Sequence, residues 1–313
     1  MTTEITTSSP SSLRTAIDWT PLIERFTASQ DVKESSRGLY ARTLRLFFGW
    51  VEKTGRNLNE LRREDILTYK DNLLNSGLSS LTTGSYLTSL RKFYEWTEGE
   101  TIYPNIAKSV KTPKRRQTFR KQHLTETASK DLLHYFEEKS LRDFAIVNRA
   151  LRTGLRTIEI VRANIGDITF KGGRRILLVW GKGRDERDNF VVLTEKSWEP
   201  IREYLQTRKG AKAGDPLFVS DSRQNKGERL TTRTISGICK EGLRAIGLDG
   251  REFTAHSLRH TTAVTILTHG GSLTDAQSVL RHTSPTTTEI YIKSIEEELR
   301  LQNSPESRLD NAF

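Results

Sequence analysis

The second half of the chain carries six polar residues that only a compact fold could bring together into one site. Each lies in its own short signature, and long stretches of sequence separate the signatures. Two arginines, a lysine and two histidines can hold a phosphodiester through charge and hydrogen bonds, and a tyrosine nearby can attack it. The signatures are Thr153-Gly154-Leu155-Arg156, Gly181-Lys182-Gly183, His256-Ser257-Leu258-Arg259-His260, Leu280-Arg281-His282 and Thr288-Glu289-Ile290-Tyr291.

The overall charge favours an anionic partner. The 313 residues carry a formal net charge of +11, and this length is enough for two domains with cores of their own. Nucleic acid and an acidic membrane surface both fit that charge. No apolar run approaches the ~20 residues that span a bilayer, and no basic amphipathic stretch stands out. We therefore expect nucleic acid and no membrane.

Cysteine usage and the N-terminus favour a cytoplasmic protein. Cys239 is the only cysteine, so an internal disulfide is impossible. It lies beside Ile235 and Ile238 in a predicted helix, which favours a buried, unreactive thiol over a nucleophile. Residues 1–12 lack the basic and apolar regions of a signal peptide.

The first half is predicted to be a small helical domain at residues 20–107, after a flexible arm at residues 1–19. Thr20, followed by a proline, is expected to cap a short helix that ends near Phe26. Further helices are expected from Ser35 or Ser36 to Gly55, from Arg63 to Asn75, and from Ser80 past Trp96. Candidate DNA contacts on the outer faces are Arg42, Arg91 and Lys92.

A basic segment at residues 108–121 joins the two halves. It contains one proline and no acidic residue. A solvated linker is the usual fate of such a charge run, but the lack of compensating acids favours a path along a phosphate backbone. Its basic residues are Lys108, Lys111, Lys114, Arg115, Arg116, Arg120 and Lys121.

The second domain, residues 122–294, is predicted to be mixed α/β with a small three-stranded sheet, which makes the whole chain α+β and mainly helical. Thr125 is expected to cap its first helix, and a helix from Leu141 to Arg152 leads into Gly154. The rest of the chain is expected to be helical to its end, interrupted at its glycines. The predicted strands are Asp167–Phe170, Arg175–Trp180 and Asn189–Leu193, and the predicted breaks include Gly242, Gly247, Gly250 and Gly270.

Arg156 is expected at a helix junction, between an end at Gly154 and an N-cap at Thr157, where a guanidinium can grip two phosphate oxygens. A surface ion pair with Glu159 is the alternative. Lys182, flanked by glycines, is expected at a hairpin tip, where a solvated lysine is the alternative, and no nucleotide P-loop motif is present.

His256 and Arg259 are three residues apart on a helix that Thr254 is expected to cap, so they share a face. The spacing from His256 to His260 suits zinc, but a cation at Arg259 and the missing protease glutamate disfavour metal. Tyr291 lies between isoleucines, and tyrosines in such surroundings usually belong to a core. A cationic pocket would instead stabilise its phenolate.

The five signatures, in this order, resemble the active site of the tyrosine recombinase (phage integrase) family, of the compact Xer-like or mobile-element integrase type. The resemblance implies a helical, SAM-like core-binding domain and a catalytic domain that together clamp duplex DNA. It implies that Tyr291 is the nucleophile, that Arg156 and Arg259 hold the non-bridging oxygens, and that Lys182 is the general acid. It further implies His256 as proton shuttle, His282 as hydrogen-bond donor and His260 as a supporting residue, beside Glu159.

The implied reaction is strand exchange through a 3′-phosphotyrosyl link and a Holliday junction, with no metal, nucleotide or other cofactor. Four protomers would act on a core site with inverted repeats, and a second recombinase or accessory factor is compatible with this scheme. The acidic tail at residues 295–313, with apolar Ile295, Leu299 and Leu301, would dock on a neighbouring protomer, and a frayed acidic terminus is the alternative.

Two departures from the family pattern stand out. Arg281 occupies the position before His282 where glycine is usual, and Asp185 follows the Gly-Lys-Gly motif where a second basic residue is common. Arg281 would either reach a phosphate or strain a tight turn. A type IB topoisomerase, a telomere resolvase, and a non-enzymatic DNA-binding protein on a recombinase scaffold remain the alternatives.

Overall fold

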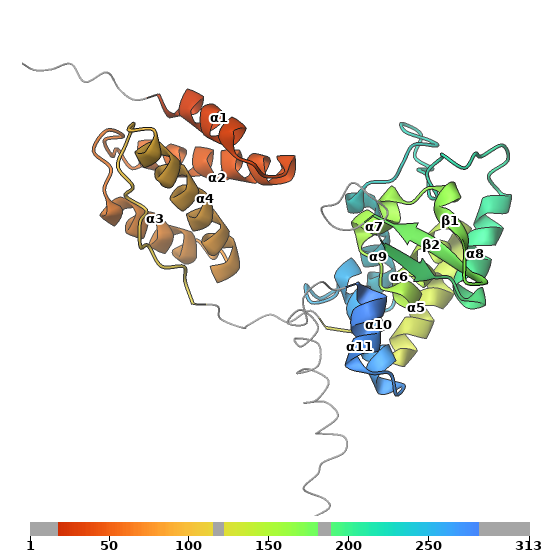
Figure 1. Cartoon of the computed structure of the whole chain (residues 1–313). Coiled ribbons are helices and arrows are strands. Elements are labelled where there is room, and N and C mark those ends of the chain that lie inside the picture. The colour runs from red at the N-terminus through yellow and green to blue at the C-terminus, as the bar shows by residue number, and fades with distance from the viewer. Residues whose placement is uncertain (1–17, 115–121, 181–188, 282–313) are drawn as a thin grey trace, which may run out of the picture. The chain divides into compact units, whose positions relative to one another are not determined.

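The computed structural model describes residues 18–114, 122–180 and 189–281, which form two compact units (Figure 1). The division between the units falls at Thr118 and Phe119, inside the basic segment. Lys182, His282 and Tyr291 lie outside the described residues, as do Arg115, Arg116, Arg120 and Lys121. Within the described ranges, none of the helices combines the length and the apolar composition that crossing a bilayer requires.

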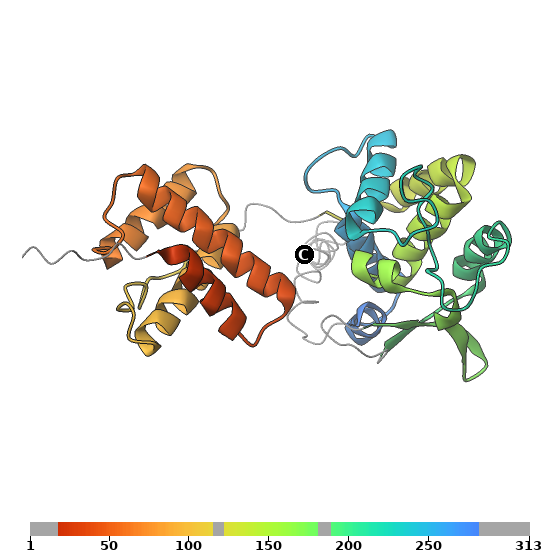
Figure 2. The same ribbon diagram turned by 90° about the horizontal axis from the view of Figure 1, so that it is seen from above.

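The first unit is a bundle of four helices around an aromatic core, as predicted (Figures 1 and 2). The ring of Trp19 stacks on Phe48 with centroids 4.5 Å apart, and Phe93 meets Phe26 edge-on at 5.4 Å. Large rings fill this core because a unit of this size has few residues to bury. The helices are α1 (Trp19–Ser29), α2 (Glu34–Lys53), α3 (Arg63–Asn75) and α4 (Ser80–Gly99).

The ends of this unit differ from the prediction. Asp18, not Thr20, caps α1, because its carboxylate accepts a hydrogen bond from the backbone N–H of Thr20 at 2.9 Å. Helix α2 begins after Lys33 and has no side-chain cap, so Ser35 and Ser36 lie within its first turn. At the other end Val110 is 2 % exposed in the aromatic core, so the basic segment begins as a packed part of the first unit.

The second unit surrounds a central helix, α6 (Leu141–Thr153), which packs against α5 (Glu126–Lys139), α8 (Glu195–Gln206) and α10 (Ala255–Thr268). Figure 1 shows the sheet lying beside α8, with α10 and α11 (Leu273–Leu280) at another side of the unit. The remaining elements are α7 (Thr157–Arg162), a 3₁₀ turn at Ile165–Asp167, and α9 (Thr232–Ala245).

The sheet has three antiparallel strands in the order β1 (Ile168–Lys171), β2 (Arg174–Val179) and β3 (Asn189–Val192). The strands agree with the predicted ones, and Gly172-Gly173 forms the predicted turn between β1 and β2. Leu177 pairs with Ile168 and Val191, and all three side chains therefore share the face that packs on the core.

The predictions for residues 207–231 and for Gly242 were wrong. Residues 207–231 are not helical; they form turns, held by isolated bridges between Asn164 and Pro216 and between Val219 and Arg229. Gly242 does not break a helix but lies inside α9, where its missing side chain lets the helix approach α5. The prediction for Cys239 is confirmed, since it is 1 % exposed and burial raises the pKa of its thiol to about 12.

The close approach of α9 and α5 gives a stability prediction. A methyl group on Gly242 would lie 2.3 Å from Cε2 of Phe136 and 2.6 Å from Cδ1 of Leu132, whereas one on exposed Gly237 of the same helix would meet nothing within 4 Å. Gly242→Ala should therefore destabilise the unit by about 1–3 kcal/mol through overpacking. Gly237→Ala should stabilise it by up to about 1 kcal/mol through helix propensity. Urea unfolding measures both, and equal midpoints for the two variants would contradict this packing.

Candidate functional site

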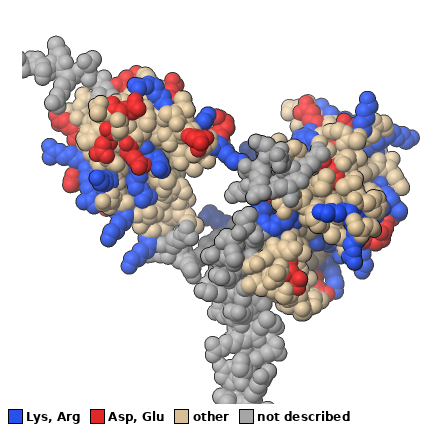
Figure 3. Space-filling view, viewed as in Figure 1, with Lys and Arg blue, Asp and Glu red and all other residues tan. Residues whose placement is uncertain are grey.

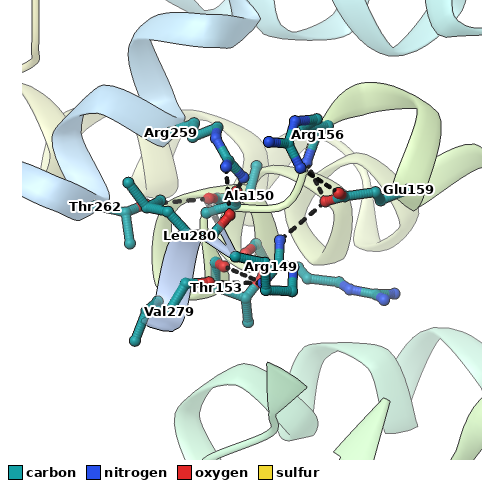
Figure 4. A network of polar contacts seen from close by, with 11 residues as sticks. Arg149, Ala150, Thr153, Arg156, Glu159, Arg259, Thr262, Val279 and Leu280 are labelled. Atoms are coloured by element: carbon teal, nitrogen blue, oxygen red, sulfur yellow. Dashed lines mark hydrogen bonds and ion pairs between the residues drawn. The ribbon is translucent and has the colours of Figure 1, made fainter. Parts of the chain in front are cut away.

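The buried side chain of Arg259 joins the ends of two helices. Arg259 lies on α10 and is 1 % exposed. Its Nη1 donates a hydrogen bond to the carbonyl of Gly154, at the end of α6, and its Nη2 donates to the carbonyl of Leu280, the last residue of α11 (Figure 4). The last carbonyls of a helix have no partner within it, so a buried guanidinium is well suited to satisfy them. Arg259 thus links the segment that leads to Arg156 with the segment that leads to His282.

Gly154 lets the three helices meet. It ends α6 in the left-handed conformation, with φ 58°, and a Cβ there would lie 2.5 Å from Cδ2 of Leu280. The hydroxyl of Thr262 on α10 donates to the carbonyl of Leu151 at 2.7 Å and fixes α10 against the same turn. The prediction of a helix end at Gly154 is confirmed, and its cause is a close packing contact as well as backbone conformation.

Arg156 caps α7 in place of the predicted Thr157. Its Nη1 donates to Oε1 of Glu159 at 2.7 Å, and its backbone N–H donates to Oε2 at the same distance (Figure 4). Glu159 is buried, with 1 % of its side chain exposed, whereas the Arg156 side chain is 27 % exposed. The ion pair that the sequence offered as an alternative is therefore present, but it is partly buried, and it fixes the position of the Arg156 guanidinium.

Arg281 turns inward instead of standing at the surface, and its backbone adopts the left-handed conformation with φ 54°. Its Nη2 lies 2.9 Å from Oε2 of Glu159, so the carboxylate bridges two guanidinium groups. Burial alone would raise the pKa of Glu159, but the charge of Arg281 and the hydrogen bonds from Arg156 hold that pKa below its usual range. Glu159 is thus a charged carboxylate at neutral pH.

The two described histidines of the site lie at different depths. His256, in the first turn of α10, is exposed, whereas His260 is 5 % exposed and its ring lies edge-on to that of His123, with centroids 5.5 Å apart. Next to His260, the hydroxyl of Thr261 accepts a hydrogen bond from the backbone N–H of Leu124 at 2.9 Å. These contacts attach the start of the second unit to the helix that carries His256 and Arg259.

Sequence reasoning missed Arg149, on α6. Its side chain is fully buried, 5.9 Å from the ring centroid of Phe218, and its guanidinium nitrogens have no hydrogen-bond partner among the described residues. Burial and the charge of Arg281 lower its pKa to about 9, against the attraction of Glu159 and Asp167, so the group stays charged at neutral pH. Every residue of helix α6 from Ala145 to Ala150 is buried, so the spacing of its apolar residues gave no sign that position 149 is internal.

The described candidates for DNA contact lie at the surface of the first unit and its continuation. Arg42 and Lys92 are exposed, although Lys92 pairs with Glu95 at 3.2 Å. Arg91 is half-buried and donates to the hydroxyl of Thr112 at 3.2 Å. On the face that Figure 3 draws, acidic side chains gather on the upper part of this unit and basic ones on its lower part. The exposed lysines of the basic segment within the described residues are Lys108, Lys111 and Lys114.

The family models and the curated relatives define a tyrosine-type site-specific recombinase. Residues 122–298 match the model of the phage integrase family, and residues 26–100 match the N-terminal SAM-like domain of phage integrases. The first match covers more than half of the chain, and the chain belongs to the phage integrase family of tyrosine recombinases.

Relatives with curated names agree with this assignment. The chain is 30 % identical to tyrosine recombinase XerC of Pelobacter propionicus over 288 residues, which cover 87 % of this chain and 91 % of that protein. It is 27 % identical to tyrosine recombinase XerD of Yersinia pestis, over 90 % of this chain and 95 % of that one. The fold is similar to that of the XerH site-specific recombinase bound to a palindromic difH substrate, with a TM-score of 0.69 and 20 % identity over 92 % of this chain and 85 % of that one.

The burial of Arg149 gives a second stability prediction. Arg149→Met keeps most of the apolar side chain and removes a buried charge that has no hydrogen bonds among the described residues. Replacing such a charge by an apolar group of similar volume is often neutral or stabilising by about 1–4 kcal/mol. We expect the melting temperature to rise by at least about 2 °C. Arg149→Ala, the control, leaves a cavity and should lower it. If Arg149→Met lowers the melting temperature as much as Arg149→Ala does, the charge of Arg149 is needed to balance the carboxylates of Glu159 and Asp167.

Proposed function

We propose that Arg156, Lys182, His256, Arg259, His282 and Tyr291 form one active site that cleaves and rejoins duplex DNA. The observation that carries the proposal is the double hydrogen bond of Arg259 to the carbonyls of Gly154 and Leu280, because it draws together segments that lead directly to Arg156 and His282. Lys182, His282 and Tyr291 are included because of their sequence signatures and because the chain belongs to the family.

In the proposed reaction the oxygen of Tyr291 attacks a phosphodiester and passes its proton to His256. The new bond joins this oxygen to phosphorus, the bond to the 5′ oxygen breaks, and Lys182 gives that oxygen a proton. Arg156 and Arg259 stabilise the non-bridging oxygens, with His282 as a further donor. The 5′-hydroxyl of a partner strand then attacks the 3′-phosphotyrosyl link, which restores Tyr291 and leaves the number of phosphodiester bonds unchanged. No metal, nucleotide or other cofactor takes part in this scheme.

Arg259 must become more accessible when DNA binds. With 1 % of its surface exposed, it reaches a phosphate only after the side chains around it have moved. Arg156, with 27 % of its side chain exposed, can bind a phosphate oxygen with less rearrangement. We therefore propose that Arg156 makes the first contact with the phosphodiester and that Arg259 engages as the site closes.

We propose a core site with inverted repeats as the DNA partner and four protomers as the active assembly, in the cytoplasm. The solved XerH complex contains a palindromic substrate, which supports the first part. For the assembly, the support is the sequence of residues 295–313, where Ile295, Leu299 and Leu301 would dock on a neighbouring protomer. Sedimentation of the chain on a duplex with two half-sites, with and without residues 295–313, reports whether this segment drives assembly.

Tyr291→Phe tests the nucleophile. The change removes one hydroxyl, so we expect binding to the DNA site to persist and covalent attachment to disappear. A duplex nicked near the cleavage position, whose short 5′-hydroxyl fragment diffuses away, should trap the wild-type chain as a shifted band on a denaturing gel. Tyr135→Phe is the matched control and should form the band, because the Tyr135 hydroxyl donates to Glu241 and accepts from Lys139, and neither residue belongs to the proposed site. A band of normal intensity with Tyr291→Phe would refute the assignment.

The basic segment is tested by the salt dependence of binding. Replacing Lys114, Arg115 and Arg116 by alanine should weaken binding to specific and random DNA alike, because phosphate contacts carry no sequence information. The slope of log K against log[salt] should flatten by about 0.9 for each phosphate that is no longer neutralised.

The control removes the same charge from exposed positions in the second unit, Lys209, Lys212 and Lys226. Fluorescence anisotropy with a labelled duplex measures both triple variants. An equal change of slope in both triple variants would assign the effect to net charge. An unchanged slope in the variant of Lys114, Arg115 and Arg116 would show that the segment is a solvated linker.

A further inference from the structure

Arg281 has a backbone conformation that usually favours glycine. It ends α11 with φ 54° and ψ 47°, in the left-handed region, and within the described residues Thr101 and Ser109 are the other non-glycine positions with positive φ. An L-residue there costs roughly 1 kcal/mol relative to glycine. A side chain in this position must therefore make contacts that offset the cost.

The contacts of Arg281 are inside the unit. Its side chain is 6 % exposed, its Nη1 donates to the carbonyl of Val279 at 2.6 Å, and its Nη2 pairs with Glu159 at 2.9 Å. The guanidinium thus fixes the last turn of α11 at one end and the carboxylate beside Arg156 at the other. His282 is the next residue in the chain.

The bridge also changes the charge that Arg156 can offer. Glu159 binds Arg156 twice, through Oε1 to the guanidinium and through Oε2 to the backbone. With Glu159 alone, the carboxylate would neutralise Arg156. With Arg281 on Oε2, the three side chains keep a net positive charge, in a place where burial strengthens electrostatic interactions.

We propose that Arg281 is a positioning residue for strand cleavage. It acts through Glu159, whose carboxylate it shares with Arg156. The Arg156 guanidinium is thereby held in place, and Glu159 does not cancel the positive charge that it offers to a phosphodiester. Through Val279 it also sets the direction of the chain immediately before His282. The inference rests on the proposed role of Arg156 and assigns Arg281 no contact with DNA.

The test compares two substrates. After the cleavage position has been mapped with the wild-type chain, single-turnover cleavage is measured on a duplex with a normal phosphodiester and on one with a methylphosphonate at that position. The methylphosphonate has no charged non-bridging oxygen, so it depends less on a cationic Arg156. Arg281→Gly suits the left-handed backbone and removes the guanidinium.

We expect Arg281→Gly to cleave the phosphodiester about 10–100-fold more slowly than wild type. On the methylphosphonate, the ratio of the wild-type rate to the variant rate should be several-fold smaller. Arg281→Lys keeps the charge but loses the fork geometry, so its rate on the phosphodiester should lie between the rates of wild type and Arg281→Gly. Thr101→Gly is the matched control for relief of the left-handed backbone, and should cleave both substrates as wild type does. If Arg281→Gly does not fold, as judged by thermal unfolding, the comparison is made with Arg281→Lys.

Arg156→Ala separates the two possible failures. If it cleaves the phosphodiester at the wild-type rate, the proposed role of Arg156 is wrong. If it is slow on the phosphodiester and recovers on the methylphosphonate, while the Arg281 variant is unchanged or equally slow on both, only the inference about Arg281 is overturned.

Discussion

The site depends above all on one buried guanidinium, that of Arg259, which holds two helix ends together. The carbonyls of Gly154 and Leu280 would otherwise be unsatisfied inside the protein, because the last turn of a helix has no internal donors for them. A neutral side chain with one donor could bind only one of them. The fork geometry of arginine binds both, so the relative position of α6 and α11 is fixed by a side chain on a third helix, α10.

The charges around this link are not balanced among the described side chains. Three cations, Arg149, Arg156 and Arg281, interact with the two carboxylates of Glu159 and Asp167, and most of these groups are buried. Burying unpaired cations costs stability. The same arrangement is favourable for a reaction in which negative charge develops around a phosphorus centre, because the Arg156 guanidinium is already held in place and needs little reorganisation during the reaction. We infer that part of the folding free energy is spent on holding this cationic cluster.

Local sequence patterns predicted most elements of the fold, and their failures have specific causes. Helices α3, α4 and α6 and all three strands follow from apolar spacing and from turn residues, which act over a few positions. Thr20 looked like a cap because a proline follows it, but Asp18 supplies a stronger acceptor two residues earlier. Gly242 looked like a helix break, since its role appears only when Phe136 packs against it.

The sequence by itself determined the candidate residues of the site and the local contact between Arg156 and Glu159. The link between Arg156 and Glu159 spans three positions, so the helix that contains it almost fixes the contact. Only the tertiary structure decided that Arg281 turns inward to Glu159, 122 positions away, and that Arg149 is buried beside them. The physical reason is that the energy of a charged side chain depends on its solvation and on its neighbours. Both are set by segments far apart in the chain, and no local pattern records them.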